Sequence, residues 1–382
     1  MRVAIDIRRV HDFGVGTYTR NLIATLARLD TESGYLLLGR QQDWNELLPL
    51  PRNFSLLEFQ PNVDGLRHDV RLDWLLRRSH VHLLHTPYLI APWMMPCRHI
   101  LTVHDTSDFF DLSANGFSLG ELLYFYRTRS GLHRAWRVLS VSQATRRDLQ
   151  TLFGLPSDKI EVVYNALDAR LAESPAPEEI ERTLARYSVQ GPYLLYAGNV
   201  KPRKNIPRLI EAFALVKEEL RGHAECAGLN LIIIGDELSK HPQLRRAVVQ
   251  SRTQHDVRFL GFVPPQSLSV FYARAAVFVF PSLHEGFGLP PLEAMALGAP
   301  VVAANVSALP EVLGDAAVYV NPENVFDISR GILQVLLDPD LRARLKERGA
   351  KHVQSFSWEK SVQRVLELYR SASAPNAQPP AR

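Results

Sequence analysis

One segment of this 382-residue chain limits the available folds more than any other, because it predicts a buried strand, a glycine turn and a helix in direct succession. Residues 275–280 form an uninterrupted apolar run, which is typical of a buried parallel strand. Gly286 and Gly288 let the backbone of the next turn approach a ligand, and Pro290 and Pro291 suit the first turn of a helix. Since the free N–H groups of a helix start favour an anion, the segment predicts an α/β fold with a phosphate site.

Two glutamates flank this turn. Glu285 falls in the loop, and Glu293 lies eight positions later, about one turn into the helix. One carboxylate can then bind hydroxyls at one end of a phosphate-linked ligand and the other carboxylate at its other end. Two solvated glutamates beside a turn are the simpler interpretation, but the flanking residues 281–282 and 294–314 also follow a family pattern. Together they resemble the E-x7-E signature of the retaining glycosyltransferases of family 4.

The resemblance covers nearly the whole chain, from residue 1 to about residue 370. It implies an α/β architecture of the GT-B type, in which two Rossmann-like doubly wound domains face a cleft and a C-terminal helix crosses back to the first domain. It also implies transfer of a hexose from a nucleotide diphosphate sugar to a hydroxyl, with retention of anomeric configuration and without a metal or other cofactor.

Strands and helices alternate along the chain, which independently indicates doubly wound α/β domains. The domains expected from this pattern are 1–172 (acceptor domain), 173–190 (linker), 191–357 (donor domain), 358–370 (crossover helix) and 371–382 (disordered tail). The linker is predicted from a change in amino-acid composition toward Pro, Glu and Ala. Strands are expected at 3–8, 35–38, 55–59, 81–84, 100–103, 138–141, 160–163, 193–198, 231–234, 257–259, 277–280, 301–304 and 318–320. Helices are expected at 17–29, 69–78, 119–137, 143–153, 207–220 and 358–369.

In the first domain, candidate site residues follow the expected strands, where open α/β sheets bind their ligands. Gly14 and Gly16 open a helix, but Thr19 stands where a dinucleotide fingerprint needs its third glycine. The resemblance implies a backbone contact between Gly16 and the donor or acceptor. It also places His104 in the sugar pocket, although a histidine satisfied by a neighbouring backbone group is the plainer interpretation. His85 is a weaker candidate of the same kind.

In the second domain, three cations stand in four positions after Gly198, namely Lys201, Arg203 and Lys204. Fixed cations stabilise the charge that a departing diphosphate develops in the transition state. A solvated basic loop is the alternative. Lys204 matches a cation of the family, whereas Asn199 stands where many members carry arginine, and Arg203 would compensate.

The resemblance therefore implies a catalytic group made of His104, Glu285, Lys204 and Arg203. Glu293 would accept the ribose hydroxyls, and Glu285 would lie by the sugar hydroxyls. No general base is assigned, because the leaving phosphate oxygen can take the acceptor proton. The residues expected to bind the donor are Gly16, Gly198, Asn199, Gly235, Phe262, Gly286, Phe287, Gly288, Leu289 and Glu293.

The opening residues 5–8 and 14–18 resemble bacterial mannosyl- and rhamnosyltransferases of polysaccharide and lipopolysaccharide assembly. This favours GDP-mannose or a related donor, with a UDP-hexose as the rival, and a glycan or lipid-linked saccharide as acceptor. The aromatics and arginines of residues 122–137 predict either contact with the inner membrane surface or an ordinary helix with one solvated face.

Composition excludes several other classes. A net charge of +4 is too small to indicate a nucleic-acid partner, and the distant Cys97 and Cys226 predict no disulfide framework or metal site. We expect a cytoplasmic protein without a signal peptide or membrane span. Two other functions stay open, a GT-B phosphorylase with pyridoxal phosphate and a catalytically silent nucleotide-sugar binder.

Overall fold

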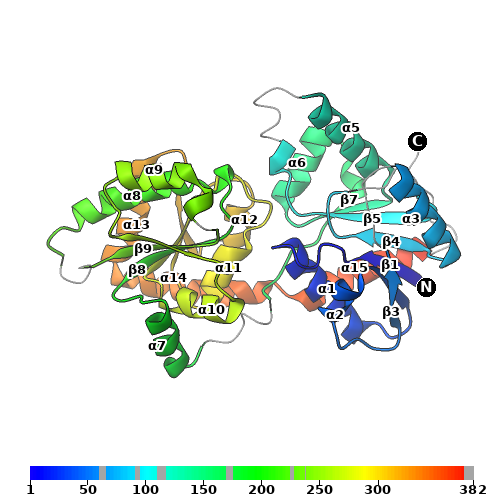
Figure 1. The fold of residues 1–382 in the computed structure, drawn as a ribbon, viewed down its shortest axis with the longest axis horizontal. Coiled ribbons are helices and arrows are strands. Elements are labelled where there is room, and N and C mark those ends of the chain that lie inside the picture. The colour runs from blue at the N-terminus through cyan, green and yellow to red at the C-terminus, as the bar shows by residue number, and fades with distance from the viewer. Residues whose placement is uncertain are drawn as a thin grey trace. The chain divides into compact units, whose positions relative to one another are not determined.

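The structure is a computed structural model that describes residues 1–59, 66–90, 95–109, 118–168, 175–223, 228–236 and 238–373 (Figure 1). The chain divides into two compact units. Unit 1 consists of Met1–Ala166 and Ser357–Arg382, and unit 2 consists of Leu167–Phe356. Each unit is a parallel sheet with helices packed on both faces, as the sequence predicts.

Unit 1 contains a seven-stranded sheet in the order β3-β2-β1-β4-β5-β6-β7. The order reverses between β1 and β4, where Val3 pairs with Leu83. The strands are β1 (Arg2–Asp6), β2 (Gly34–Gly39), β3 (Phe54–Glu58), β4 (Leu83–Thr86), β5 (Arg98–Val103), β6 (Arg137–Ser140) and β7 (Ile160–Val162).

The helices of unit 1 alternate with these strands along the chain. They are α1 (Val15–Leu29), α2 (Gln41–Asn45), α3 (Leu66–Arg78), α5 (Leu119–Arg134), α6 (Gln143–Phe153) and α15 (Trp358–Ser373). The last of these comes from the C-terminal end of the chain and packs on α1 and β4. Ser361 Oγ donates to the carbonyl of Tyr164, and Arg364 forms an ion pair with Glu161. The expectation that the C-terminal helix returns to the first domain is confirmed.

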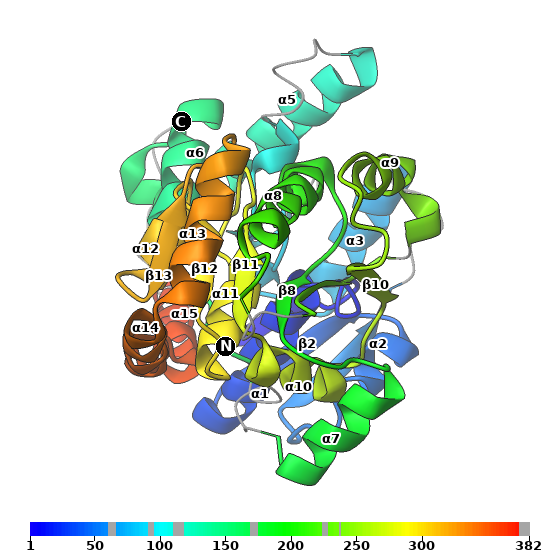
Figure 2. The same ribbon diagram turned by 90° about the vertical axis from the view of Figure 1, so that its left-hand side faces the viewer.

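Unit 2 contains a six-stranded sheet in the order β10-β9-β8-β11-β12-β13. Its strands are β8 (Tyr193–Ala197), β9 (Asn230–Ile234), β10 (Val257–Gly261), β11 (Val277–Phe280), β12 (Val301–Ala304) and β13 (Ala317–Val320). On one face lie α8 (Ile206–Glu219), α9 (Pro242–Gln250) and α13 (Val325–Leu337), as Figure 2 shows from the side. The other helices are α7 (Pro177–Arg186), α10 (Pro265–Arg274), α11 (Leu289–Ala296), α12 (Leu309–Leu313) and α14 (Pro339–His352).

Several expected boundaries differ from the structure, and three of these differences change the description of a segment. The segment expected to be a linker contains the ten-residue helix α7, which begins with Pro177 and carries two glutamates in its first turn. These are ordinary helix-start signals that the compositional shift obscured. Helix α5 ends at Arg134 rather than 137, because Trp136 already donates to His99 and leads into β6. Residues 371–373 belong to α15, and the rest of the expected tail, like Cys226, lies outside the described residues.

Candidate functional site

The carboxyl ends of β8 and β11 define the candidate site of unit 2, because the strand order reverses between these neighbours. The loops after β8 and β9 touch each other here. Gly235 has φ +154°, and a Cβ on it would lie 2.0 Å from the carbonyl oxygen of Gly198. Only glycine fits at position 235 because of this contact, and Gly198 has φ +152°, a conformation that favours glycine.

Lys204 and Glu285 meet directly in this site. Lys204 Nζ lies 2.5 Å from Glu285 Oε1, and the two side chains are only 9% and 8% exposed. The ammonium also lies 5.1 Å from the ring centroid of Phe280 at the end of β11. A buried pair of this kind holds one cation and one carboxylate at fixed positions with their charges balanced.

A short turn places Lys204. Residues Pro202–Lys204 form one turn of 3-10 helix, and Asn205 follows in the left-handed region with φ +60°. The buried Asn205 amide donates to the carbonyls of Pro281, at 3.0 Å, and Pro322, at 2.7 Å. Leu283 N–H donates to the carbonyl of Arg203 at 2.7 Å. These bonds tie the loops after β8, β11 and β13 together under the cation.

Glu285 is fixed from the opposite side. Its N–H donates to Ser307 Oγ at 2.8 Å, and Ser307 belongs to the loop after β12. The next turn depends on Gly288, whose φ is +104° and whose Cβ would lie 2.7 Å from the Leu309 side chain. The loops after β11 and β12 therefore hold the carboxylate in place.

The N-terminus of α11 offers fewer amides than the sequence suggested. The helix begins with Leu289, Pro290 and Pro291, and proline has no N–H. Leu289 is therefore the only one of these three residues that keeps an amide donor. Any anion bound there would depend mainly on the amides before the helix and on side-chain cations.

Glu293 lies on α11 beside Tyr272, whose hydroxyl donates to Glu293 Oε2 at 3.0 Å. Burial raises the pKa of Glu293 to about 7, the Tyr272 hydrogen bond opposes that rise, and nearby Asp168 adds to it. Additional hydroxyl donors, such as those of a ribose, would favour the ionised form. This geometry suits the role expected for Glu293.

In unit 1, His104 follows β5 at the carboxyl edge of the sheet. Its Nε2 lies 3.1 Å from the carbonyl oxygen of Pro87, and its ring lies edge to face on Tyr18. Burial lowers the pKa of His104 to about 4, so the ring is neutral at pH 7. His104 is thus hydrogen-bonded to a neighbouring backbone group, as the simpler interpretation of this histidine predicted. It is also half-buried at the edge of the sheet.

His85, the weaker candidate, is not a site residue. The expected strand ended at residue 84, but β4 runs through Thr86, so His85 lies inside the strand. It is completely buried and hydrogen-bonded to Thr102 and Tyr369. Its role is internal to unit 1.

Comparison with known proteins identifies the family. Residues 14–171 match the family described as Glycosyltransferase Family 4, and residues 179–352 match the one described as Glycosyl transferases group 1. The O-antigen chain mannosyltransferase B of Escherichia coli is 35% identical over 376 residues, which cover 94% of this chain and 96% of that relative. This chain belongs to glycosyltransferase family 4.

Other similarities of this family 4 chain agree. The O-antigen chain mannosyltransferase RfbU of Salmonella typhimurium is 28% identical and covers 66% of this chain and 65% of its own length. The crystal structure of Anabaena Alr3699/HepE in complex with UDP-glucose has a TM-score of 0.76 at 18% identity, covering 97% of this chain and 100% of that one. The second similarity confirms the expected GT-B fold.

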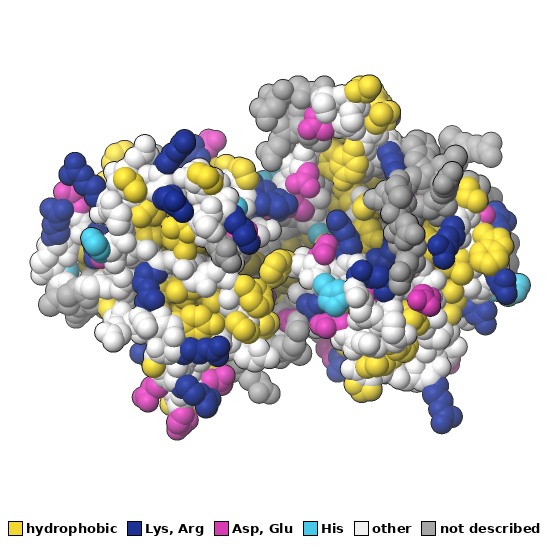
Figure 3. All heavy atoms as spheres, in the orientation of Figure 1, with side chains coloured by type: hydrophobic (Ala, Val, Ile, Leu, Met, Phe, Trp, Pro, Cys, Tyr) yellow, Lys and Arg dark blue, Asp and Glu magenta, His cyan; other side chains and the backbone are white. Residues whose placement is uncertain are grey.

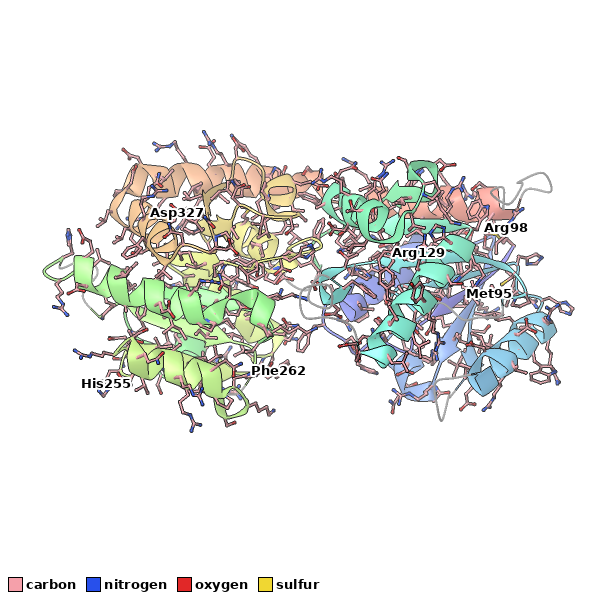
Figure 4. The ribbon with its side chains drawn as sticks, turned by 90° about the horizontal axis from the view of Figure 1, so that it is seen from above. Met95, Arg98, Arg129, His255, Phe262 and Asp327 are labelled. Atoms are coloured by element: carbon pink, nitrogen blue, oxygen red, sulfur yellow. The ribbon has the colours of Figure 1, made fainter. Side chains whose placement is uncertain are left out.

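Three further residues of the family 4 chain that were expected to bind the donor substrate lie in the loops of unit 2. Asn199 accepts a hydrogen bond from Tyr196 through its backbone carbonyl, and its side-chain Oδ1 has no hydrogen-bond partner among the described residues. Phe262 follows β10 and is 66% exposed (Figure 4). Phe287 is buried and packs edge to face on Phe356. The structure therefore places an aromatic surface beyond β10 but packs the second ring internally.

Gly16 of the family 4 chain has an internal reason to be glycine. A Cβ there would lie 2.2 Å from the carbonyl oxygen of Val10, and the Gly16 N–H already donates to Asp12. A ligand contact at Gly16 stays a prediction, and it cannot use this N–H without breaking that bond.

Sequence reasoning missed several residues that position the site, because none belongs to a recognisable motif. Asn205 acts through its left-handed backbone, and Tyr272 and Ser307 act through hydroxyls that come from other elements. An asparagine directly before a helix was the one available signal for Asn205, since asparagine tolerates the left-handed region.

Metal-ligand clusters are absent from the described part of this family 4 chain, which contains no group of three or more His, Cys, Asp or Glu side chains suited to hold an ion. The sequence has one Asp-x-Asp triplet, Asp338-Pro339-Asp340. It lies at the start of α14, where Asp338 accepts a hydrogen bond from the Leu341 N–H. Asp338 therefore serves as a helix cap.

Proposed function

We propose that this family 4 chain transfers mannose from GDP-mannose to a hydroxyl of a glycan or lipid-linked saccharide during O-antigen or related polysaccharide assembly, with retention and without a metal. The names of two relatives, both O-antigen chain mannosyltransferases, support the sugar and the acceptor class. The observation that carries the proposal is the buried ion pair of Lys204 and Glu285 at the carboxyl edge of the second sheet.

This pair suits a departing diphosphate. When the bond between the anomeric carbon and the phosphate oxygen breaks, the oxygen takes over the bonding electrons, and Lys204 and Arg203 stabilise its charge. Because Glu285 already holds Lys204 at a fixed position, little reorganisation is needed at that moment. The two cations take the part that a divalent ion plays in other transferases.

The acceptor oxygen forms its new bond on the face that the phosphate leaves, and the acceptor proton passes to the departing phosphate oxygen. No protein base is required in this scheme. Glu285 accepts hydroxyl hydrogen bonds from the sugar, Glu293 accepts those of the ribose, and His104 accepts one from the substrate. The loops of Gly198, Gly235 and Phe262 hold the nucleotide.

Helix α5 supports contact with a membrane surface. Leu119, Leu122, Leu123 and Tyr126 recur at helical spacing on one face, and their exposed fractions are 76%, 36%, 63% and 56%. Figure 3 shows apolar side chains gathered over this helix. Arg129 on the same helix is also exposed and can attract anionic headgroups. None of the described helices is long and apolar enough to cross a bilayer. From the exposed face of α5 we propose a cytoplasmic protein bound at the inner membrane surface.

The first test is donor binding. Melting temperatures measured with GDP, UDP, ADP and dTDP in the presence of EDTA should rise with GDP, because a ligand at about 100 times its Kd stabilises by roughly 2.7 kcal/mol. A rise with UDP alone would replace GDP-mannose by a UDP-hexose. Binding without any nucleotide release, on addition of donor sugar and acceptor extracts, would indicate a silent binder.

A second test separates binding from chemistry. Glu293→Ala should weaken nucleotide binding, whereas Lys204→Ala should mainly slow transfer. Negligible effects of both would contradict the site assignment. The anomeric configuration of the product, read by NMR, tests retention.

A further inference from the structure

A hydrogen-bonded chain of four side chains runs through the interior of unit 1. Tyr18 OH and Thr102 Oγ1 are 3.2 Å apart, and the same Oγ1 lies 2.8 Å from His85 Nε2. His85 Nδ1 lies 2.5 Å from Tyr369 OH. The chain thus links α1, β5, β4 and the crossover helix α15, and all four side chains are at most 1% exposed.

This chain is uncharged. Burial lowers the pKa of His85 to about 3, and neighbouring His99 and His104 lower it further, while burial raises the pKa of Tyr18 to about 12. A neutral imidazole has one N–H and one acceptor nitrogen, so His85 donates to one hydroxyl and accepts from the other. Such a chain fixes the orientation of every hydroxyl in it.

Tyr18 also contacts His104. The two ring centroids are 4.8 Å apart with an interplanar angle of 74°, and Trp358 of α15 packs on the same tyrosine ring at 5.8 Å. Thr102, which anchors the Tyr18 hydroxyl, belongs to β5, and His104 directly follows that strand. The Tyr18 ring is held at its hydroxyl end by Thr102 and packs edge to face on His104 and Trp358.

The backbone settles which nitrogen of His104 carries a proton. Nε2 faces the carbonyl oxygen of Pro87, which can only accept, so Nε2 carries the hydrogen. The neutral ring then has its lone pair on Nδ1. No hydrogen bond to Nδ1 is present among the described residues.

We propose that Tyr18 is a positioning residue for the transfer reaction, holding His104 in the orientation in which Nδ1 accepts a hydrogen bond from a substrate hydroxyl. The inference rests on the proposed function, because it takes His104 to contact the substrate. The hydroxyl chain to Tyr369 makes this orientation depend on the crossover helix. Tyr18 acts through His104 and has no contact with substrate itself.

The test compares two substitutions of Tyr18. Tyr18→Phe keeps the ring and loses the link to Thr102, so kcat should fall about three- to tenfold, with an unchanged KM for the donor. Tyr18→Leu also removes the ring contact, and its kcat should fall to that of His104→Ala. In the His104→Ala background, Tyr18→Phe should have no further effect on kcat.

Tyr35→Phe is the matched control. Tyr35 is another completely buried tyrosine of unit 1, and its hydroxyl donates to Asp30 at 2.7 Å. This variant should lower the melting temperature and leave kcat unchanged well below that temperature. If Tyr18→Phe behaves in the same way, Tyr18 is merely structural and the inference is overturned.

A measurement without substrate separates this inference from the proposed function. In protein labelled with 15N histidine, the His104 signals, assigned through His104→Gln, should show an unprotonated Nδ1 in the wild type and a mixture of tautomers in Tyr18→Leu. Unchanged signals in Tyr18→Leu would overturn the inference even if transfer is observed. An absence of turnover with every nucleotide sugar, together with the expected change in signals, would instead overturn the proposed function alone. If His104→Ala is fully active while Lys204→Ala is slowed, His104 has no role in the reaction and the inference is overturned. The proposed transfer reaction is not contradicted by that result.

Discussion

Lys204 Nζ lies 2.5 Å from Glu285 Oε1 although 81 residues separate the two along the chain. Each residue belongs to a loop at the end of a different strand, and neither side chain is more than 9% exposed. A pair so placed is costly to break, because the remaining charge stays buried without its partner.

Removing one member of this pair should therefore cost both stability and activity. Lys204→Met should lower the free energy of unfolding by about 3–5 kcal/mol and transfer by about 10²–10³-fold. The double variant Lys204→Met with Glu285→Gln should recover most of the stability and none of the activity. Urea unfolding and initial rates measure the two effects. Lys217→Met, which breaks the half-exposed pair with Asp256 at 2.9 Å, should cost less than about 1 kcal/mol.

Glu293 predicts a pH dependence of stability. Its pKa is raised to about 7 in the folded protein, so the folded state binds a proton more tightly than the unfolded state does. Its contribution to stability is fully present at pH values below the unfolded pKa and is lost as the pH rises to about 7. Melting temperatures between pH 4.5 and 8 should show this loss in the wild type and a smaller one in Glu293→Gln. The exposed Glu323→Gln should follow the wild type.

The same group predicts a pH dependence of nucleotide binding. Ribose hydroxyls donate to the ionised carboxylate, so the affinity should rise as the pH increases from about 6 to 8 and then level off. Titration calorimetry measures this directly. An affinity that is independent of pH in this range would argue that Glu293 does not accept the ribose.

Asn205 should matter through its two amide hydrogen bonds to Pro281 and Pro322. Asn205→Gly keeps the left-handed backbone accessible and loses both bonds, which should cost about 2–4 kcal/mol and slow transfer because Lys204 loses its support. Asn205→Ala should cost more, since alanine also disfavours φ +60°. Equal unfolding free energies of the two variants would show that the backbone conformation contributes little.

Gly235→Ala should abolish nucleotide binding and destabilise unit 2. The new Cβ would lie 2.0 Å from the Gly198 carbonyl oxygen, and the backbone there has φ +154°. Gly120→Ala is the matched control, because nothing lies within 4 Å of a Cβ at this helical position of α5. The control should stabilise the protein by about 0.5–1 kcal/mol. Far-UV circular dichroism and melting curves distinguish the two.

The apolar face of α5 predicts binding to anionic vesicles. Leu123→Glu should weaken co-sedimentation with phosphatidylglycerol vesicles, because it removes buried apolar area and adds a like charge. Leu337→Glu changes an exposed leucine of α13 in unit 2 and should leave vesicle binding unchanged. Equal binding of all three proteins would assign the α5 face to another partner.

The sequence predicted the fold class, the succession of strands and helices along the chain, and the glycine turns. These features depend on local periodicity and on glycine itself. It also predicted that Lys204 and Glu285 follow strands, which brings both to one sheet edge. It could not predict that they form an ion pair, because that contact depends on the amide bonds of Asn205. The error at His85 has the same origin as most boundary errors, since two more residues of strand turned an edge residue into an interior one.

Unit 1 contains both the first strand of the chain and helix α15, which begins at Trp358. During synthesis the ribosome therefore releases all of unit 2 before the last piece of unit 1. Until then the Tyr18 ring lacks its contact with Trp358, and His85 lacks its hydrogen bond to Tyr369. The surface of unit 1 that α15 later covers is therefore exposed in the nascent chain. The unit that is translated first is thus completed last, and a ribosome that stalls late in translation holds a finished unit 2 attached to an unfinished unit 1.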